Sequence, residues 1–478
     1  MEKRILGKTG IEVSVFGFGS YRVDSRVRPQ AEALRKALLS GINFIDTSTN
    51  YSDGNSEILI GEVIKEIEVS TSLRRSNFII ASKAGYIQGK NLESVKRHEA
   101  QGLVYPEVTD CSPDLRHCIH PSFLKDQITE SIKRMDCGYL DLFLIHNPEY
   151  FLMYSHERDL TKLRKEYYSR LRAAFEHLEE ESKAGRIRYY GISSNTFGQQ
   201  SFHRHFTSLE EILKISPNGK FDKGISVIQL PLNLKEKDSL TLVNQAENGK
   251  SAIKLAHKAG LGVIINRPLN AIVNNRIERL GDFDMQGSFN LKDLQASYRK
   301  VEVLAETVIH EMKRQMRLGY EKIQDMKDSF GIARFLMKNF DDLDNPVSLT
   351  DLLEFYVNPR IRMIKSIVIE NESTPGIVVE VAQNFLMEVK NFTMILQTIV
   401  IAKYNMNNMK LHGILNNYLP QELKGHTLAR KSLIMTASLP CVSSVLVGMR
   451  TQKYVEDVIE ASKNLLTSEQ EAFWFMER

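Results

Sequence analysis

The segment Leu140-Asp141-Leu142-Phe143-Leu144-Ile145-His146 is a short apolar run that ends in an ionisable residue. Its length and its large apolar side chains predict a buried β-strand. Similar runs alternate along the chain with amphipathic helical patterns, for example Phe123–Arg134 and Leu163–Lys183. The other predicted strands are Val13–Phe18, Asn43–Asp46, Phe78–Lys83, Arg188–Ile192, Ser226–Leu230, Gly262–Asn266 and Val442–Val447.

This alternation indicates parallel strands that are joined by crossover helices. Eight strand–helix units favour a closed (β/α)₈ TIM barrel of the α/β class over an open sheet. The last strand precedes a predicted helix at Gln452–Ser462. The opening segment Arg4–Val13 is expected to form a β-hairpin across the barrel floor, because Gly10 follows polar turn residues.

Residues 273–424 interrupt the pattern between the seventh strand and the seventh barrel helix, which is expected to begin near Gly425–Leu428. Helical periodicity dominates there, so we expect a barrel of residues 1–272 and 425–478 with a large, all-helical insertion. Two apolar stripes are expected to pack on each other, in preference to pairing with a second subunit. They are Leu291, Leu294, Tyr298, Val301, Ala305, Val308, Met312 and Val378, Ala382, Phe385, Val389, Phe392, Leu396, Ile399.

The composition is that of a globular protein, with 42% hydrophobic and 26% charged residues in a chain of 478. A net charge of +4 gives no electrostatic reason to expect nucleic acid as a partner. No signal segment is predicted at Met1–Gly7, and the apolar stretch Met394–Ala402 is too short to span a bilayer, so no membrane partner is expected.

The chain has four cysteines, too few in this length for a disulfide framework, which predicts a reducing, cytoplasmic location. Cys111 and Cys118 lie near His117 and His120, but their spacing fits no zinc pattern. We therefore expect a polar loop there and no metal site.

Ionisable residues at strand ends are the strongest indication of chemistry. Asp46, Lys83 and His146 each end a predicted strand, and Tyr51 lies in the loop after Asp46. The C-terminal ends of barrel strands form the mouth where such folds carry active sites. Taken singly, each residue has an ordinary structural explanation, such as a surface aromatic, a helix cap or a rim residue. As a set, they suit a tyrosine acid whose pKa is lowered by a lysine that an aspartate pairs.

The sequence resembles the aldo-keto reductase family over residues 1–272 and 425–478. The matching segments lie in the family's order and form a specific pattern only in combination. They are Gly17–Tyr21, Asp46–Tyr51 with Ser56-Glu57 and Gly61, Ala81–Lys83, Leu140–His146, Gly185–Ser194, Val227–Gln229 and Val445–Arg450. The resemblance implies an oxidoreductase that reduces aldehydes or ketones with NADPH, or runs in reverse on a sugar or alcohol.

The resemblance also implies roles for individual residues. Asp46, Tyr51, Lys83 and His146 would form the catalytic tetrad, with Tyr51 as the proton donor. The cofactor would be held by Gly19, Ser20, Asp46, Ser193, Ser194, Asn195, Gln229, Asn266, Arg267, Gly448, Met449 and Arg450. Arg450 would favour NADPH, with NADH as the alternative, because a guanidinium can bind a 2′-phosphate with two hydrogen bonds.

The sequence departs from the family pattern around the nicotinamide. Ser194 stands where the family usually has asparagine, and Asn195 is a candidate for the missing amide. Asn266-Arg267-Pro268-Leu269 stands where the family usually has a stacking aromatic residue followed by Ser-Pro-Leu. The loop Ala84–His120 and the segment Asn147–Tyr154 are expected to shape the substrate site.

Two functions remain open from the sequence. The first is a carbonyl reductase that acts on a small carbonyl or sugar substrate. The alternative is a non-enzymatic nicotinamide-binding regulatory module that acts, or forms oligomers, through the helical insertion. In the enzyme reading, residues 273–424 are expected to form a lid at the active site, because strand-to-helix loops emerge at the barrel mouth.

Overall fold

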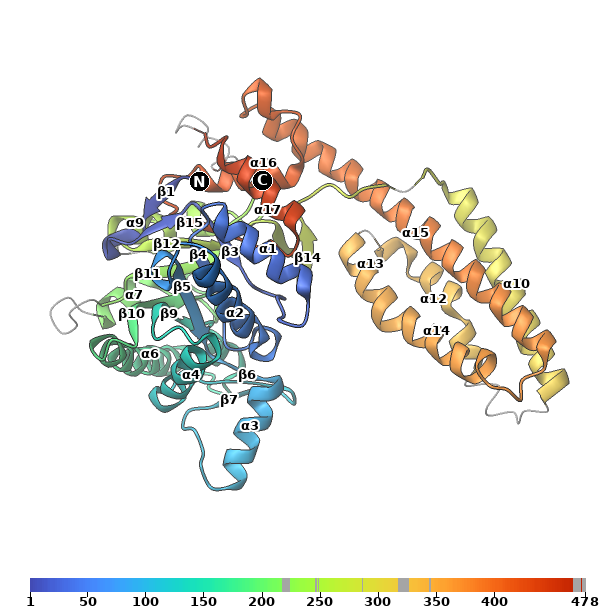
Figure 1. Ribbon diagram of the computed structural model, residues 1–478, viewed down its shortest axis with the longest axis horizontal. Helices are drawn as coiled ribbons and strands as arrows, with labels where there is room; N and C mark the ends of the chain where they lie inside the picture. Colours follow the sequence, from blue (N-terminus) through green and yellow to red (C-terminus); the bar gives the residue numbers. More distant parts are fainter. Residues whose placement is uncertain are drawn as a thin grey trace. The chain divides into compact units, whose positions relative to one another are not determined.

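The structure is a computed structural model that describes residues 1–216, 224–245, 247, 249–285, 287–316, 326–343, 345–466 and 474. The chain divides into two compact units, which Figure 1 shows. The barrel unit comprises Met1–Ala271 and Tyr418–Arg478, and the helical unit comprises Ile272–Asn417. The predicted barrel segment 425–478 extends past the described residues.

The barrel unit contains a closed barrel of eight strands in which all recorded neighbours run parallel, as predicted. Burial of nearly every strand residue explains the continuous apolar runs in the sequence. The strands, in their order around the barrel, are β3 (Phe16–Gly19), β4 (Phe44–Asp46), β5 (Ile79–Ala84), β9 (Leu140–His146), β10 (Ile187–Ser193), β11 (Val227–Pro231), β12 (Gly262–Asn266) and β15 (Ser444–Val447).

Helices connect the strands and carry recognisable start signals. The Asp159 carboxylate accepts the first backbone N–H groups of α6, and the hydroxyls of Thr427 and Thr451 cap α16 and α17 in the same way. The α-helices of this unit outside the barrel loops are α1 (Arg28–Leu39), α2 (Asn55–Ser70), α4 (Pro121–Met135), α6 (Leu160–Lys183), α7 (Leu209–Ile215), α8 (Asp238–Thr241), α9 (Ala252–Lys258), α16 (Leu428–Ala437) and α17 (Gln452–Ser462).

The predicted hairpin is present as antiparallel β1 (Lys3–Ile5) and β2 (Glu12–Ser14). Leu6 of its turn belongs to the buried cluster inside the barrel, so the hairpin closes the barrel floor. The predicted strand Val13–Phe18 was wrong as one element, because β2 ends at Ser14 and β3 begins at Phe16. The Ser14 hydroxyl donates to the Phe16 carbonyl at 2.7 Å, across the break between the two strands.

The long segment after β5 was predicted as a loop but contains secondary structure of its own. An antiparallel sheet orders its strands β6 (Tyr86–Gln88), β8 (Leu115–His117) and β7 (Thr109–Ser112), and helix α3 (Gly89–Ala100) lies between β6 and β7 in the sequence. The strands have only three or four residues each, so they produce no readable alternation of apolar and polar residues.

The helical unit needs one correction, because β14 (Arg276–Arg279) lies within the segment predicted to be all-helical. It pairs with β13 (Asn270–Val273). Asn274 and Asn275 join the two strands with φ of 49° and 61°. Positive φ at both central residues is typical of a tight hairpin turn, and asparagine tolerates it. The two strands are too short to be distinguished from loop in the sequence.

The two apolar stripes lie on α10 (Leu291–Met316) and α15 (Gly376–Asn416), and both contribute to one hydrophobic core. The prediction that they pack on each other is therefore confirmed. The remaining helices are α12 (Ile332–Lys338), α13 (Pro346–Leu352) and α14 (Asn358–Ile364), with π-helical turns η6 (Leu353–Val357) and η7 (Lys365–Ile369) around α14.

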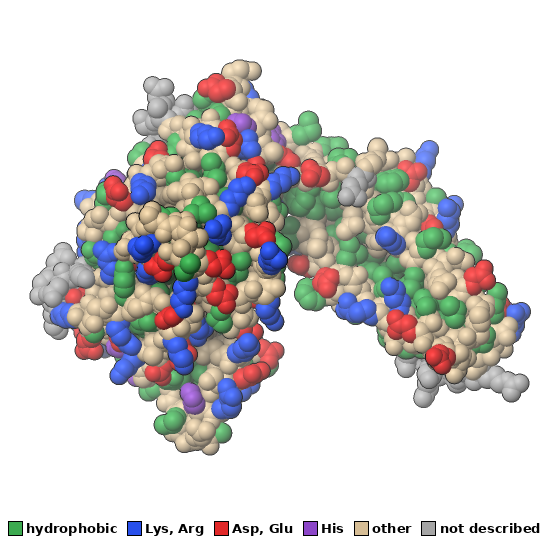
Figure 2. Space-filling model, in the orientation of Figure 1, with side chains coloured by type: hydrophobic (Ala, Val, Ile, Leu, Met, Phe, Trp, Pro, Cys, Tyr) green, Lys and Arg blue, Asp and Glu red, His purple; other side chains and the backbone are tan. Residues whose placement is uncertain are grey.

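Helix α15 is long and apolar enough to cross a membrane, although its most apolar window is 39% buried in the unit. Buried residues such as Phe385 and Phe392 make it the core helix of the unit, a role that explains its composition. Figure 2 shows hydrophobic side chains on the surface of this unit, and acidic and basic side chains interspersed over the visible face of the barrel unit.

Candidate active site

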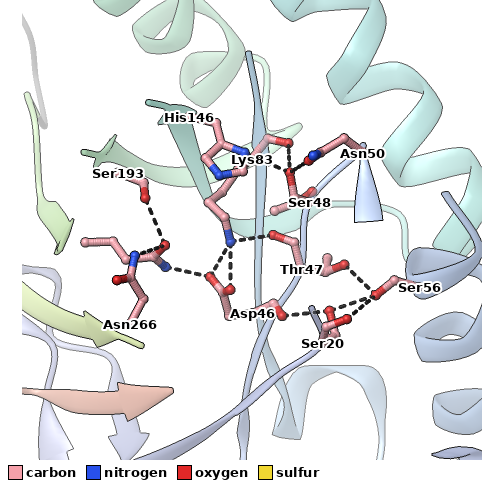
Figure 3. A network of polar contacts seen from close by, with 12 residues as sticks. Ser20, Asp46, Thr47, Ser48, Asn50, Ser56, Lys83, His146, Ser193 and Asn266 are labelled. Carbon is pink, nitrogen blue, oxygen red and sulfur yellow. Dashed lines mark hydrogen bonds and ion pairs between the residues drawn. The ribbon is translucent and has the colours of Figure 1, made fainter. Parts of the chain in front are cut away.

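The four residues of the predicted tetrad lie together at the C-terminal ends of neighbouring strands. Asp46 ends β4, Lys83 lies near the end of β5, and His146 ends β9. Tyr51 begins the short helical turn η2 (Tyr51–Gly54) that follows β4. Figure 3 shows Asp46, Lys83 and His146 in one polar network, because parallel strands deliver their last residues to the same mouth.

Lys83 and Asp46 form a buried ion pair, with the lysine side chain fully buried and the aspartate 5% exposed. The Nζ of Lys83 donates to Oδ1 and Oδ2 of Asp46 at 2.8 and 2.7 Å, and to the Thr47 carbonyl at 2.7 Å. An ammonium group has three hydrogens, so all its donors are engaged. Burial lowers the pKa of Lys83, and Asp46 opposes this effect.

Tyr51 contacts this pair through its ring, whose centroid lies 5.1 Å from Nζ of Lys83. The prediction that the pKa of Tyr51 is lowered was wrong. Burial, and then the negative charge of Asp46, raise the pKa of Tyr51 well above its usual value. Burial outweighs the nearby positive charge of Lys83, so Tyr51 remains a protonated phenol.

His146 is also buried, and burial lowers its pKa well below the usual value, with Lys83 and His117 adding to the effect. It is therefore neutral. A hydrogen bond of 3.1 Å joins Nδ1 of His146 to the Ser48 hydroxyl and fixes the orientation of the ring. Sequence reasoning missed Ser48, although the residue lies inside the Asp46–Tyr51 block that it singled out.

A cluster from two loops holds His146 from the other side. The neutral ring of His117 donates from Nε2 to the His146 carbonyl at 2.7 Å, and burial lowers the pKa of His117 to about 4. The Tyr86 ring meets the His146 ring edge-on, with centroids 4.7 Å apart. The Asn147 amide donates to the Tyr86 hydroxyl at 2.6 Å. The loop Ala84–His120 therefore contacts His146 directly, and the segment Asn147–Tyr154 contacts that loop through Tyr86.

Asn147 follows His146 with φ of 48°, a left-handed conformation that carries some backbone strain, although asparagine adopts it more readily than most residues. Strain of this kind persists where surrounding contacts enforce it, and it concentrates at functional sites. Its hydrogen bond to Tyr86 is one such contact.

Three polar side chains lie next to Asp46 at the barrel mouth, and they come from β10, β11 and β12. The Ser193 hydroxyl donates to Oε1 of Gln229 at 2.9 Å, and Nε2 of Gln229 donates to Oδ1 of Asp46 at 2.7 Å. Asn266 approaches the same Gln229 oxygen with its Nδ2 at 3.5 Å. We call Ser193, Gln229 and Asn266 the amide row. Through Gln229 the row contacts Asp46 of the tetrad.

The residues that follow Ser193 are tied to the protein. The Ser194 hydroxyl lies 3.1 Å from that of Thr196, so it is engaged within the loop. The backbone N–H of Asn195 donates to Oε1 of Glu149 at 2.8 Å, while the Asn195 side chain is exposed. Sequence reasoning missed Glu149, which is fully buried; burial raises its pKa to about 7.

The other residues that were predicted to bind the cofactor form two groups. Gly19, Ser20 and Arg267 lie at the ends of β3 and β12, and Gly448, Met449 and Arg450 follow β15. Ser20, next to Gly19, donates from its hydroxyl to the Asp46 carbonyl at 2.8 Å and braces the end of β4. Arg267 forms an ion pair with Glu236 at 2.8 Å. Beyond β15 lie Gly448, the buried Met449 and the partly exposed Arg450, directly before the residue that caps α17. A helix N-terminus beside a guanidinium suits an anionic phosphate.

A nicotinamide cofactor fits these residues. Asn266 presents a buried side-chain oxygen, Oδ1, that has no hydrogen-bond donor within the described part of the chain. An unpaired buried acceptor is uncommon, and a bound amide would satisfy it. Among the described residues no group of three or more His, Cys, Asp or Glu is arranged to hold a metal ion.

A model of the family described as "Aldo/keto reductase family" matches residues 16–306. L-galactose dehydrogenase of Arabidopsis thaliana is 31% identical over 31% of this chain and 39% of its own length. The 6-dehydroglucose reductase of Novosphingobium aromaticivorans is 24% identical over 58% of this chain and 90% of its own length. The NADH-specific methylglyoxal reductase of Escherichia coli is 25% identical over 30% and 42%.

The chain spans less than two thirds of the length of most curated relatives that it matches, between 36% and 58%. A solved aldo-keto reductase of Bacillus halodurans aligns with a TM-score of 0.49 and 15% identity, over 99% of this chain and 95% of its own.

Proposed function

Because the chain belongs to the aldo/keto reductase family, we propose that it reduces an aldehyde or ketone with a nicotinamide cofactor, with Tyr51 as the proton donor. The observation that carries this proposal is the buried network of Asp46 and Lys83 beside Tyr51 and His146 at the barrel mouth. Burying an ion pair there contributes little net stability, so a chemical role is the better explanation.

When bound, the cofactor supplies a hydride to the carbonyl carbon. The Tyr51 hydroxyl gives its proton to the carbonyl oxygen, so that the C=O group becomes an alcohol and Tyr51 a phenolate. The raised pKa of Tyr51 keeps this proton in place until the oxygen acquires charge. The alkoxide is the stronger base of the two, so the transfer is favourable.

The other network residues position these groups. Asp46 holds Lys83 near the Tyr51 ring, where the ammonium stabilises the phenolate that the proton transfer leaves. The neutral His146, oriented by Ser48 and by the backbone contact with His117, lies against Tyr51 with ring centroids 6.2 Å apart. It is placed to contact the carbonyl oxygen that Tyr51 protonates.

Substrate class and reaction direction are part of the proposal. The names of two relatives, L-galactose dehydrogenase and 6-dehydroglucose reductase, support a sugar or a sugar-derived carbonyl compound. The direct experiment mixes the pure full-length chain with NADPH or NADH and a panel of simple aldehydes, methylglyoxal and oxidised sugars. Cofactor oxidation that depends on one of these carbonyls is expected. A panel without any turnover, despite cofactor binding, would favour the regulatory alternative.

For the cofactor we propose NADPH, with Arg450 contacting the 2′-phosphate. Its place before the α17 cap supports this, whereas the name of the NADH-specific methylglyoxal reductase shows that the other choice exists among relatives. Arg450→Ala is expected to weaken NADPH binding roughly tenfold, the usual scale for a charge-assisted contact, and to leave NADH binding nearly unchanged. Titrations of both cofactors measure this difference, and equal losses would contradict it.

A further inference from the structure

Asn266 occupies the last position of β12, directly after the apolar run Gly262–Ile265. The strand register places Gln229 beside Ser193, and it places Asn266 beside Pro231, two residues beyond Gln229. Asn266 therefore lies one step nearer the C-terminal end of the strands than Gln229. Figure 3 shows Asn266 and Ser193 approaching the same side chain. A polar amide at this position ends a strand that is otherwise buried and apolar.

The orientation of the Asn266 amide is determined by its neighbour. Oε1 of Gln229 accepts hydrogen bonds, and it already receives the Ser193 hydroxyl at 2.9 Å. Only the NH₂ end of Asn266 can face that oxygen, and Nδ2 indeed lies 3.5 Å from it. Oδ1 of Asn266 therefore points away from Gln229, and this buried atom meets no donor from the described residues.

Gln229 has little capacity left for a ligand. Its oxygen faces two donors, and its nitrogen donates to Asp46 at 2.7 Å. Asp46 in turn receives two bonds from Lys83. Releasing Gln229 to bind a ligand would thus disturb the pair that supports Tyr51. The free acceptor of the amide row is Oδ1 of Asn266.

We propose that Oδ1 of Asn266 accepts a hydrogen bond from the carboxamide NH₂ group of the nicotinamide ring. The inference rests on the proposed function, since it requires a nicotinamide cofactor. The NH₂ group of a carboxamide is a donor that would satisfy an unpaired amide oxygen. An aromatic side chain at this position could only stack on the ring. The cofactor is then recognised here by a specific hydrogen bond, and a ring without the NH₂ group binds less tightly.

The competing candidate for an amide contact is Asn195. Its side chain is exposed and its backbone N–H donates to Glu149, and among the described residues no hydrogen bond is recorded between its amide and the row. The two candidates can be separated by matched substitutions to leucine, which keep the size of the side chain and remove its polar atoms.

The experiment measures, by calorimetric titration of the full chain, three ligands that share the same 2′-phosphorylated adenosine half. They are NADP⁺, its 3-acetylpyridine analogue, which lacks the NH₂ donor, and 2′-phospho-ADP-ribose, which lacks the ring. The unmodified chain is expected to prefer NADP⁺ over the analogue by about tenfold, the scale of one hydrogen bond to an otherwise unpaired buried group.

Asn266→Leu is expected to abolish this preference and to leave 2′-phospho-ADP-ribose binding within about twofold, while Asn195→Leu retains the preference. If Asn266→Leu keeps the preference, the inference is overturned. Should Asn266→Leu fail to fold, Asn266→Ser is measured in the same way, because its short hydroxyl cannot reach the same point. A chain that binds none of the three ligands contradicts the proposed function itself, which is a separate outcome.

Discussion

The barrel mouth and the helical unit solve the problem of burial in opposite ways. The mouth buries ionisable groups, among them Asp46, Lys83, His146 and Glu149, each at most 6% exposed. The core of the helical unit consists of apolar side chains from α10, α12 and α15 and their neighbours. Apolar burial stabilises a fold directly, whereas buried charges roughly balance their attraction against lost hydration.

This difference indicates which region carries chemistry. The helical core is explained by stability alone, since its stripes would otherwise be exposed. The network from Ser193 through Gln229 to Asp46 and Lys83 is not, because apolar residues of similar size would serve stability as well.

The largest effect is expected at the buried pair. Asp46→Asn removes the carboxylate from Lys83 and leaves an ammonium group without a counter-charge, at a cost of about 3–5 kcal/mol of unfolding free energy. Turnover should fall as well, because Lys83 loses its position beside Tyr51. Denaturant unfolding and steady-state rates measure both effects.

Asp136→Asn is the matched control, since the Lys65–Asp136 pair is exposed, with 55% and 74% of the side chains accessible. An exposed pair contributes roughly 0–1 kcal/mol. If Asp46→Asn were no more destabilising than Asp136→Asn, the mouth would not depend on its buried pair.

A second test removes the helical unit. Replacing residues 274–417 with a short Gly-Ser linker keeps the buried Leu419 and Leu423 of the barrel unit. Because each unit has its own core, the barrel is expected to fold without the helices. If the lid that was expected from the sequence exists, cofactor release and small-aldehyde kinetics should change by several-fold in the truncated chain. Unaltered kinetics in the folded truncation would favour a remote partner-binding role.

A smaller effect is expected from Glu149 and depends on pH. Burial raises the pKa of Glu149 to about 7, from its ordinary value of 4.5. The folded chain therefore keeps the Glu149 proton to a higher pH than the unfolded chain does. The stability of the fold is therefore unaffected by Glu149 below pH 4.5, where the group is protonated in both states. As the pH rises from there through about 7, the unfolding free energy falls by up to ~3 kcal/mol.

Glu149→Gln should remove this loss, so the variant gains stability relative to the parent as the pH rises from 4.5 to 8. Unfolding free energies across this range measure the gain. The exposed Glu62→Gln is the control and should follow the parent curve. Parallel curves for Glu149→Gln and the parent would show that Glu149 is not protonated by burial.

Much of the fold could be predicted from the sequence because barrel strands are buried on both faces and read as continuous apolar runs. The helix Gln452–Ser462 was predicted with its exact bounds, and Thr451 before it supplies the cap. The short strands β6, β7, β8 and β14 could not be predicted, because three or four residues show no periodicity. Their pairing depends on contacts that a sequence does not display.

The candidate site was predicted unevenly for a similar reason. Asp46, Lys83 and His146 were predicted because they are ionisable residues at the ends of apolar strands, and the structure places them together. The direction of the Tyr51 pKa shift could not be predicted, because it depends on how deeply the fold buries the phenol and on how close Asp46 lies to it. Ser48 and Glu149 were missed because a serine and a glutamate in loops are usually exposed, and only the packing shows that they are buried.

The most direct test of the account is the turnover of Tyr51→Phe with the best substrate of the carbonyl panel. The substitution keeps the ring beside Lys83 and His146 and removes only the proton that the carbonyl oxygen should receive. The account predicts a loss of at least roughly hundredfold in kcat, the usual scale for an acid catalyst, with unchanged cofactor affinity and thermal unfolding. Near-normal turnover in the folded variant would contradict the assignment of Tyr51 as the proton donor.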